Sequence, residues 1–466
     1  MTDSSHYPPT GLIRIVDPAK EPKPISDIAP EVLDEAQRAE AERKAQLRLR
    51  TRMIAAGFHD PSKAERWLNA PELASVSQDA LLSGLRLSPS PDTALPALVR
   101  LIEKHPAVAE RANRGEEEFG MYRILGASQA VGDFLYRRPE LIDPLFDTQV
   151  YPAESALIRS QHPASILPET DGEFLTPIAP LDTPYRRDIL TALGADPHAE
   201  RPRAAAEQTG KDGYVTLRVA YRAALARIAM IDVCCEDPVE MMPTIGRHLA
   251  DLAAAALEGA LAIARTEVAE GLGPGLAAPR RGEAVDALDL AIIGMGKCGA
   301  RELNYISDVD VVYVVAPVES APSAGVDEES APLKLTENEC STIGTELVHA
   351  LTRAIMGPAP EPALWEVDAN LRPEGKDGPL VRTVESYVQY YKRWAENWEF
   401  QALLKARPIA GSAQLGARYA RAIDPFVWES AARESFVESV QAMRARVTDN
   451  IPSHQVDRQI KLGPGG

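Results

Sequence analysis

Two aspartates separated by one residue, Asp308 and Asp310, open an apolar run that has the composition of a β-strand. Side chains alternate between the two faces of a strand, so both carboxylates are expected on the same side. Two carboxylates side by side repel each other and raise each other's pKa. A fold accommodates such a pair most easily when a divalent cation lies between them, so this spacing predicts a metal site.

A glycine-rich turn lies just before the aspartates. It follows an apolar run that begins at Leu288 and has the pattern of a first strand. The backbone N–H groups of such a turn can approach a phosphate closely, which suggests that a phosphate accompanies the metal. The candidate nucleotide- or phosphate-binding residues here are Gly294, Gly296, Lys297 and Gly299, together with Ser307 beside the first aspartate.

Three kinds of nucleotide site compete for this turn. The pattern G-x-G-x-x-G also occurs in dinucleotide-binding folds, but there the acidic residue follows about 20 residues on, at the far end of the second strand. Here the acids come sooner and at the near end. The phosphate-loop pattern fails at two positions, because Ala291 replaces its first glycine and Cys298 its hydroxyl residue. A nucleotidyltransferase core, in which a Gly turn precedes a strand carrying D-x-D, fits best.

A third carboxylate is expected from a later strand, because two metal ions need at least three acidic side chains between them. Asp368 is the candidate, at the end of a short mixed run that begins at Leu364. Glu366 would lie on the same strand face as a spare ligand. Arg372, just beyond, can hold a phosphate oxygen in a bidentate fork.

Further cations and aromatic residues lie on predicted helices. A long helix over 384–406 carries two tryptophans and three tyrosines, which are expected in the core. Lys405 and Arg407 end it, where the helix dipole favours cations, and phosphate contact is the alternative. In the helix over 214–231, Arg218, Arg222 and Arg227 are expected in surface or intrahelical ion pairs, with helix docking or phosphate contact as the alternative.

The composition narrows the class of protein. The formal net charge of −18 argues against a general nucleic-acid binder, which would present a basic face. The four cysteines form no C-x-x-C pair, which is typical of reduced thiols and predicts a cytoplasmic protein. No apolar run approaches the ~20 residues of a membrane span, so no membrane association is expected.

The chain of 466 residues is long enough for two to four domains. The predicted fold is mainly α, with an embedded α+β nucleotidyltransferase core of the polymerase-β-like type and helical domains before and after it. The ending KLGPGG reads as a loop that enters another element, so the chain is expected to be a fragment of a longer protein. The predicted regions are a flexible tail over 1–28, a helical region with a Pro-rich connector over 29–203, the catalytic core over 204–411 and a helical segment over 412–466.

The segment from Gly294 to Asp310 resembles the G-x-G-K-x-G-x-x-E-L-N-x-x-S-D-x-D signature of the glutamine synthetase adenylyltransferase/deadenylase family. Three later segments, VDANLRP from Val367, GPLV from Gly378 and LKARP from Leu404, resemble the same family. The predicted helical segment LGASQAVGDFLYRRPEL, which begins at Leu125, also resembles this family. The combined resemblance covers roughly residues 95–466.

The resemblance implies a function. Members of that family hold two nucleotidyltransferase cores, and this chain, with one core of the first type, resembles the half that removes AMP from adenylylated glutamine synthetase. Inorganic phosphate would attack the AMP phosphorus and release ADP, with Mg²⁺, in two ions, held by Asp308, Asp310 and Asp368. Asn370 stands where the family often has arginine, so no phosphate contact is implied there. A PII-type signalling protein is the implied regulator.

Two alternatives stay open, because the residues alone do not set the direction of AMP transfer. The same core can add AMP from ATP to glutamine synthetase. A catalytically silent module that uses the nucleotidyltransferase shell to bind a partner is the other possibility.

Overall fold

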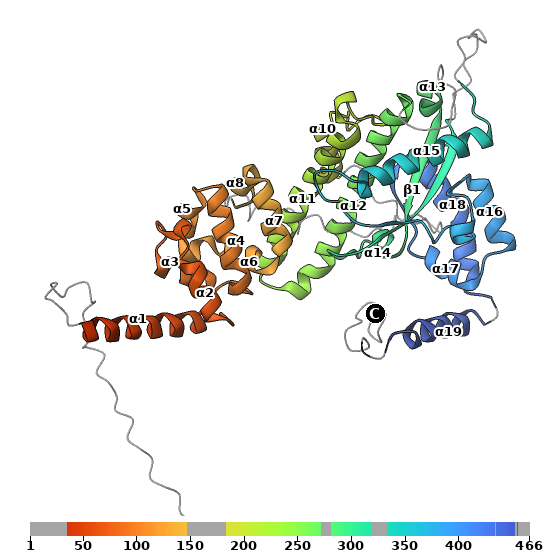
Figure 1. Cartoon of the computed structure of the whole chain (residues 1–466). Coiled ribbons are helices and arrows are strands. Elements are labelled where there is room, and N and C mark those ends of the chain that lie inside the picture. The colour runs from red at the N-terminus through yellow and green to blue at the C-terminus, as the bar shows by residue number, and fades with distance from the viewer. Residues whose placement is uncertain are drawn as a thin grey trace, which may run out of the picture.

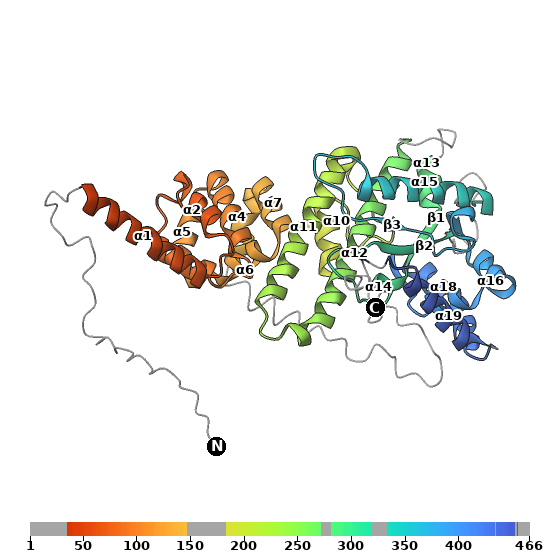
Figure 2. The ribbon, with the colours of Figure 1, turned by 60° about the horizontal axis from the view of Figure 1, so that its bottom comes forward.

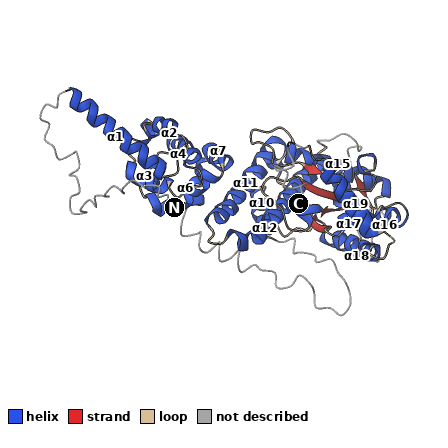
Figure 3. Ribbon diagram, turned by 90° about the horizontal axis from the view of Figure 1, so that it is seen from below, coloured by secondary structure: helices blue, strands red, loops and turns tan. Residues whose placement is uncertain are grey.

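A computed structural model describes residues 35–146, 183–271, 281–318, 333–433, 435–452 and 454. Helices make up most of it, and the strands form one small sheet in the C-terminal half (Figure 3). Figure 1 shows short helices gathered at one end, the sheet at the other, and long helices between them. The predicted tail over 1–28 and most of the Pro-rich connector lie outside the described residues.

The N-terminal helices form their own core. Several helices of this region begin at a serine. Ser77, Ser90 and Ser128 are N-caps whose side chains each accept a backbone N–H that the helix leaves unpaired. The buried side chains are mostly leucine, isoleucine and alanine. The helices are α1 (Glu35–Ala55), α2 (Pro61–Leu68), α3 (Gln78–Leu85), α4 (Pro91–Lys104), α5 (Val108–Ala112), α6 (Phe119–Ala127), α7 (Gln129–Arg137) and α8 (Ile142–Phe146).

Two long helices connect this bundle to the sheet, as Figure 2 shows. In α11 (Gly210–Cys234), Ala226, Ala229 and Met230 pack into the N-terminal core, while Leu217 and other residues pack into the core beside the sheet. The following helix α12 (Pro238–Ala269) is buried along most of its length, which its run of alanines permits. The short helix α10 (Pro184–Ala192) packs against α12.

The sheet is mixed. Strands β1 (Leu288–Gly294) and β2 (Val309–Pro317) are antiparallel, and β1 also pairs antiparallel with β5 (Arg407–Gly411). On its outer side β2 pairs in parallel with two short strands, β3 (Val367–Asp368) and β4 (Val381–Arg382). The order is therefore β3-β2-β1-β5, with β4 also against β2.

Helices cover both faces of the sheet. Alternate residues of β2, such as Val311 and Tyr313, pack toward α12 and α15 (Glu337–Met356), whereas Val312 and Val314 pack toward the opposite layer. Burial on both faces explains why the central strands are continuous apolar runs. The opposite layer contains α16 (Val384–Arg393), α17 (Asn397–Leu403) and α18 (Ala413–Ser430). The remaining α-helices in the described part of the chain are α13 (Arg281–Asp286), α14 (Gly296–Gly299) and α19 (Phe436–Asp449).

The predicted helix over 384–406 is wrong as one element. It ends after Arg393, and a new helix begins at Asn397, where Glu396 and Glu399 form a capping box. Arg407 therefore begins strand β5 and does not end a helix. The core prediction holds for Tyr387 and Tyr391, which are buried, but Trp394 is 72% exposed.

Among the arginines of α11, Arg218 departs from the expectation of surface or intrahelical ion pairs, whereas Arg227 is exposed and Arg222 forms an ion pair with Glu361 at 3.2 Å. Arg218 is fully buried, and its guanidinium donates to the carbonyl oxygens of Ala354, Gly357 and Glu361. Helix docking, the alternative interpretation, is thus correct for Arg218. Among the described residues, no helix combines the length and the apolar character that crossing a membrane requires.

Candidate active site

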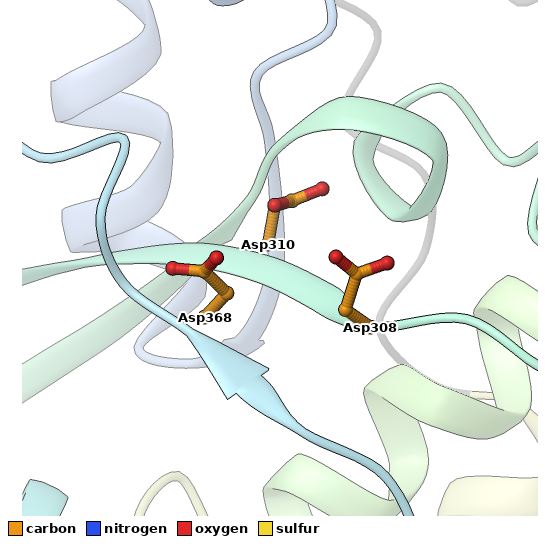
Figure 4. A group of neighbouring side chains, drawn as sticks. All are labelled: Asp308, Asp310 and Asp368. Atoms are coloured by element: carbon orange, nitrogen blue, oxygen red, sulfur yellow. The ribbon is translucent and has the colours of Figure 1, made fainter. Parts of the chain in front are cut away.

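Three aspartates meet at the edge of the sheet. One carboxylate oxygen from each of Asp308, Asp310 and Asp368 lies within 4.8 Å of the others, and all three residues are half-buried. Figure 4 shows the three carboxylates turned toward a common space. Three negative charges this close repel strongly unless a cation lies among them. Oxygen-only ligands suit a hard divalent ion such as Mg²⁺, so these residues fit the predicted metal.

Strand pairing brings Asp368 to the other two aspartates. Asp310 and Asp368 are direct partners in the parallel β2–β3 ladder. The backbone N–H of Val309 donates to the carbonyl oxygen of Glu366 at 2.9 Å, which fixes this register. The Glu366 side chain is exposed and is not part of the aspartate cluster, so the structure does not use it as the spare ligand.

Short local bonds orient two of the carboxylates. Asp368 accepts the backbone N–H of Asn370 at 2.7 Å, which closes a turn just after the strand. The Ser307 hydroxyl donates to Asp308 at 3.4 Å. Ser307 thus lies at the site and contacts the carboxylate of the neighbouring Asp308.

The Gly turn packs directly on the aspartates. The backbone N–H of Met295 donates to the carbonyl oxygen of Asp310 at 2.8 Å. Gly296 has a φ of +51°, and a Cβ there would come within 2.5 Å of the Asp310 Oδ2 atom. Gly294 lies against Ile409, and a Cβ at Gly299 would overlap the carbonyl oxygen of Lys405. Close approach to the Lys405 backbone requires glycine at position 299, and the positive φ together with the close approach to Asp310 requires it at position 296.

The predicted cations divide into two groups. Arg372 donates to three carbonyl oxygens of its own loop, those of Ala369, Lys376 and Gly378, and so holds that loop together. Arg407 is buried and donates to the carbonyl oxygens of Gly299 and Cys298 at 2.9 and 3.3 Å. Both arginines thus support the backbone of the site. The ammonium group of Lys405 forms an ion pair with Glu302 at 2.9 Å. Lys297 directly follows Gly296 on α14 and is half-buried.

A cavity opens from Asp308 that the sequence did not reveal. Its volume is about 410 Å³, and its wall includes the aromatic residues Tyr221, Tyr305 and Trp365. Tyr305 stands three residues before Asp308, and Trp365 stands three residues before Asp368. This equal spacing of an aromatic residue from each acid was the sequence signal that could have indicated the cavity. Arg222, Leu225, Ile306, Ser307, Leu364 and Glu366 complete the wall, which we call the aspartate-side cavity.

Burial keeps several nearby groups in their neutral form. It raises the pKa of the Cys298 thiol to about 12 and that of the Tyr221 phenol to about 12. The pKa of Tyr305 is also raised, by burial and by its hydrogen bond to Asp232. Near the aspartates, the Tyr221 phenol therefore keeps its proton, the Tyr305 proton is held by Asp232, and the thiol is not a nucleophile at neutral pH.

Comparison with known proteins identifies the family. The family model described as glutamate-ammonia ligase adenylyltransferase matches residues 189–422, which include the Gly turn and all three aspartates. A bifunctional glutamine synthetase adenylyltransferase/adenylyl-removing enzyme of Leifsonia xyli subsp. xyli is 42% identical over 89% of this chain and 37% of its own length. The enzymes of the same name from Streptomyces coelicolor and Corynebacterium glutamicum are 41% and 38% identical, over 89% and 83% of this chain.

The chain spans little more than a third of the length of these relatives: 37%, 35% and 34% of them are covered. The matched part contains the strands, the turn and the acidic residues that form the site. With that match, the chain belongs to the glutamate-ammonia ligase adenylyltransferase family.

Proposed function

We propose that this chain is a nucleotidyltransferase that removes AMP from an adenylylated tyrosine of glutamine synthetase by phosphorolysis. The observation that carries the proposal is the aspartate cluster with the Gly turn packed against Asp310. The names of the relatives combine an adenylyltransferase and an adenylyl-removing activity. The described residues contain one such site, and the chain covers about a third of these relatives, which supports one of the two activities. The sequence E-L-N-Y, from Glu302 to Tyr305, resembles the half that removes AMP.

The reaction balances without an added oxidant or reductant. An oxygen of hydrogen phosphate attacks the phosphorus of the AMP group, a new P–O bond forms, and the bond between phosphorus and the tyrosine oxygen breaks. The products are ADP and the tyrosine, whose oxygen takes up the proton that the phosphate carried. The leaving phenolate is the difficult group, because its conjugate acid has a pKa of about 10.

The residues of the chain would share this work. Asp308, Asp310 and Asp368 would hold magnesium, which when bound neutralises charge on the phosphates and on the leaving oxygen. The turn at Gly296 would present backbone N–H groups to the anionic phosphate, with Lys297 beside it. Ser307 holds Asp308, and the buried Arg407 holds the turn, so both would act by positioning.

Asp308→Asn combined with Asp310→Asn tests the proposal. The wild-type chain, with adenylylated glutamine synthetase, Mg²⁺ and phosphate, is expected to release ADP. The rate of ADP release by the double variant should be at least about 1,000-fold lower, because electrostatic stabilisation by the site is lost. Its circular dichroism and melting temperature should stay unchanged. Asp133→Asn, which removes a carboxylate paired at the surface with Arg100, is the matched control and should keep full activity.

Two outcomes would redirect the proposal. If the wild type releases no ADP but transfers AMP from ATP to unmodified glutamine synthetase, the chain is the adding enzyme. If it does neither and calorimetry detects no Mg²⁺-dependent nucleotide binding, the chain is a non-catalytic module. Retained ADP release in the double variant would contradict the assignment of the metal site.

A further inference from the structure

The aspartate-side cavity shares a wall with a second cavity that lies farther from the acids. This second cavity has a volume of about 360 Å³ and lies between α6, α7, α11 and the loop before Ser307. We call it the apolar cavity, because side chains such as Ile124, Val131 and Phe134 dominate its wall. Four residues line both cavities: Arg222, Leu225, Tyr305 and Ile306.

The substrate of the proposed reaction has two arms around one phosphorus. One arm is adenosine, whose ribose hydroxyls and base edge need hydrogen-bond partners. The other is a tyrosine ring that continues into a polypeptide. Burying adenosine in the apolar cavity would leave its polar groups unpaired, which is unfavourable. An apolar side chain of a polypeptide loses no hydrogen bond there and is stabilised by leaving water.

The arrangement of the site favours the same assignment. The Gly turn, with its backbone N–H groups, lies against Asp310, while the aspartate-side cavity opens from Asp308. The anionic phosphates are attracted to the turn, so the uncharged tyrosyl arm is directed toward Asp308. Only the arm that continues as a polypeptide requires space beyond the first cavity.

The loop between the two cavities is held in place yet presents an apolar side chain. The Tyr305 hydroxyl donates to Asp232 on α11 at 2.8 Å, which anchors the loop to the helix. The next residue, Ile306, is 93% exposed, two residues before the catalytic Asp308. Ile306 lines both cavities, so this anchored loop makes their apolar walls continuous from Asp308 to α7.

We propose that the two cavities form a binding cleft for the polypeptide of the protein substrate. The modified tyrosine occupies the aspartate-side cavity, and an apolar side chain near it in the substrate sequence occupies the apolar cavity. This inference rests on the proposed function and adds to it the place where the substrate is recognised. It assigns that role to α6 and α7 of the N-terminal bundle, which lie far from the acids in sequence.

Two substitutions test the cleft without touching the acids or the core. Ala130→Glu and Ala127→Glu each place a charge at an exposed position, on α7 and α6 respectively, that lines the apolar cavity but not the aspartate-side cavity. The matched controls are Ala39→Glu and Ala45→Glu, both at exposed positions of α1. Each protein is assayed with adenylylated glutamine synthetase and with the small AMP ester of N-acetyltyrosinamide.

We expect both cleft variants to raise KM for the protein substrate at least 10-fold. Their activity on the small ester should stay within 2-fold of wild type, because the ester does not reach the apolar cavity. The controls should change neither value. An unchanged KM for the protein, or an equal loss on both substrates, would overturn the inference.

A binding measurement separates this inference from the proposed function. Adenylylated glutamine synthetase is immobilised, and binding of each variant is measured by interferometry without phosphate. If the wild type releases no ADP from either substrate, the proposed function fails. In that case, weaker binding of Ala130→Glu than of Ala45→Glu still supports the cleft, and equal binding refutes it.

Discussion

Gly296 lies directly against Asp310, so close that a Cβ at position 296 would come within 2.5 Å of the carboxylate Oδ2 atom. The same residue has a φ of +51°, a conformation that other residues adopt only with strain. Two independent constraints therefore require glycine at this one position. The turn and the acidic strand are thus packed together, and the backbone N–H of Met295 also donates to the carbonyl oxygen of Asp310.

Gly296→Ala should for this reason impair activity far more than stability. The added methyl group must displace the Asp310 carboxylate, and misplacement by about 1 Å can lower a rate ~100-fold. The strain of the left-handed conformation adds about 1 kcal/mol of destabilisation. Phosphate-dependent ADP release and thermal melting measure the two effects. Gly282→Ala, whose Cβ would meet no atom within 4 Å, is the control, and a fully active Gly296→Ala would contradict this prediction.

Arg407→Lys distinguishes a supporting role from a phosphate contact. Lysine keeps the charge but cannot reproduce the forked hydrogen bonds that Arg407 makes to Gly299 and Cys298. We expect a loss of about 2 kcal/mol in the free energy of unfolding and a lower kcat, with the KM for phosphate within 2-fold of wild type. A large rise in KM for phosphate with unchanged stability would instead favour direct phosphate contact.

Glu361→Gln should destabilise the chain strongly. This carboxylate is 1% exposed, and it pairs with Arg137, Arg138 and Arg222 at 3.1, 3.6 and 3.2 Å. Removing its charge leaves a group of arginines without a counter-ion, at a cost of ~3 kcal/mol after allowing for the partly exposed ends of two of them. Urea unfolding measures the loss. Asp133→Asn, which breaks a half-exposed pair, should cost less than about 1 kcal/mol, and equal losses would refute the prediction.

The stability of the fold should fall in mild acid because of His248. Burial lowers the pKa of this histidine, although Asp251 opposes the shift, so the folded chain holds it neutral. The unfolded chain takes up a proton near pH 6.5. Stability contributed by His248 is thus complete above about pH 6.5 and is lost as the pH falls below that value toward the lower folded pKa.

Unfolding by urea at several pH values checks this expectation. His248→Asn should flatten the stability profile below about pH 6.5, whereas His349→Asn, at an exposed position, should leave it unchanged. An acid profile that is the same for His248→Asn and wild type would show that another group is responsible.

The thiols should differ in reactivity. Burial raises the pKa of Cys298 to about 12 and that of Cys340 to about 11, and the thiolate is the reactive form. Cys234 and Cys235 are half-buried. Labelling the native protein with iodoacetamide at pH 7.5, followed by peptide mass spectrometry, should modify the last two at least about 10 times faster. Rapid labelling of Cys298 in the native state would contradict the described burial.

The aspartate cluster could be predicted from the sequence because its information is local. The two-residue spacing of Asp308 and Asp310 fixes their common face on a strand, and the turn after Asp368 marks the end of another. Only one strand pairing, between β2 and β3, is needed to bring Asp368 beside Asp308 and Asp310. The cluster therefore agrees with the expectation drawn from spacing and residue type.

The supporting residues could not be predicted, because their partners are distant in sequence. Nothing near Arg407 shows that it begins a strand, since β5 exists only through its pairing with β1. Arg218 donates to Glu361, 143 residues later, and that pairing leaves no local pattern. The break after Arg393 lacks glycine and proline, so the capping box at Glu396 was its only local signal.

Asp368 joins the site through a ladder of two residues, whereas β2, which leads on from Asp308, pairs with β1 over seven positions. Asp310 therefore lies on a strand that a long pairing holds in place, whereas Asp368 is attached through a much shorter pairing. Separating β3 from β2 breaks few hydrogen bonds, so the third ligand can leave at a small cost in free energy. The affinity for a divalent cation should then depend on how firmly β3 pairs with β2, and titration with Mg²⁺ measures that local stability.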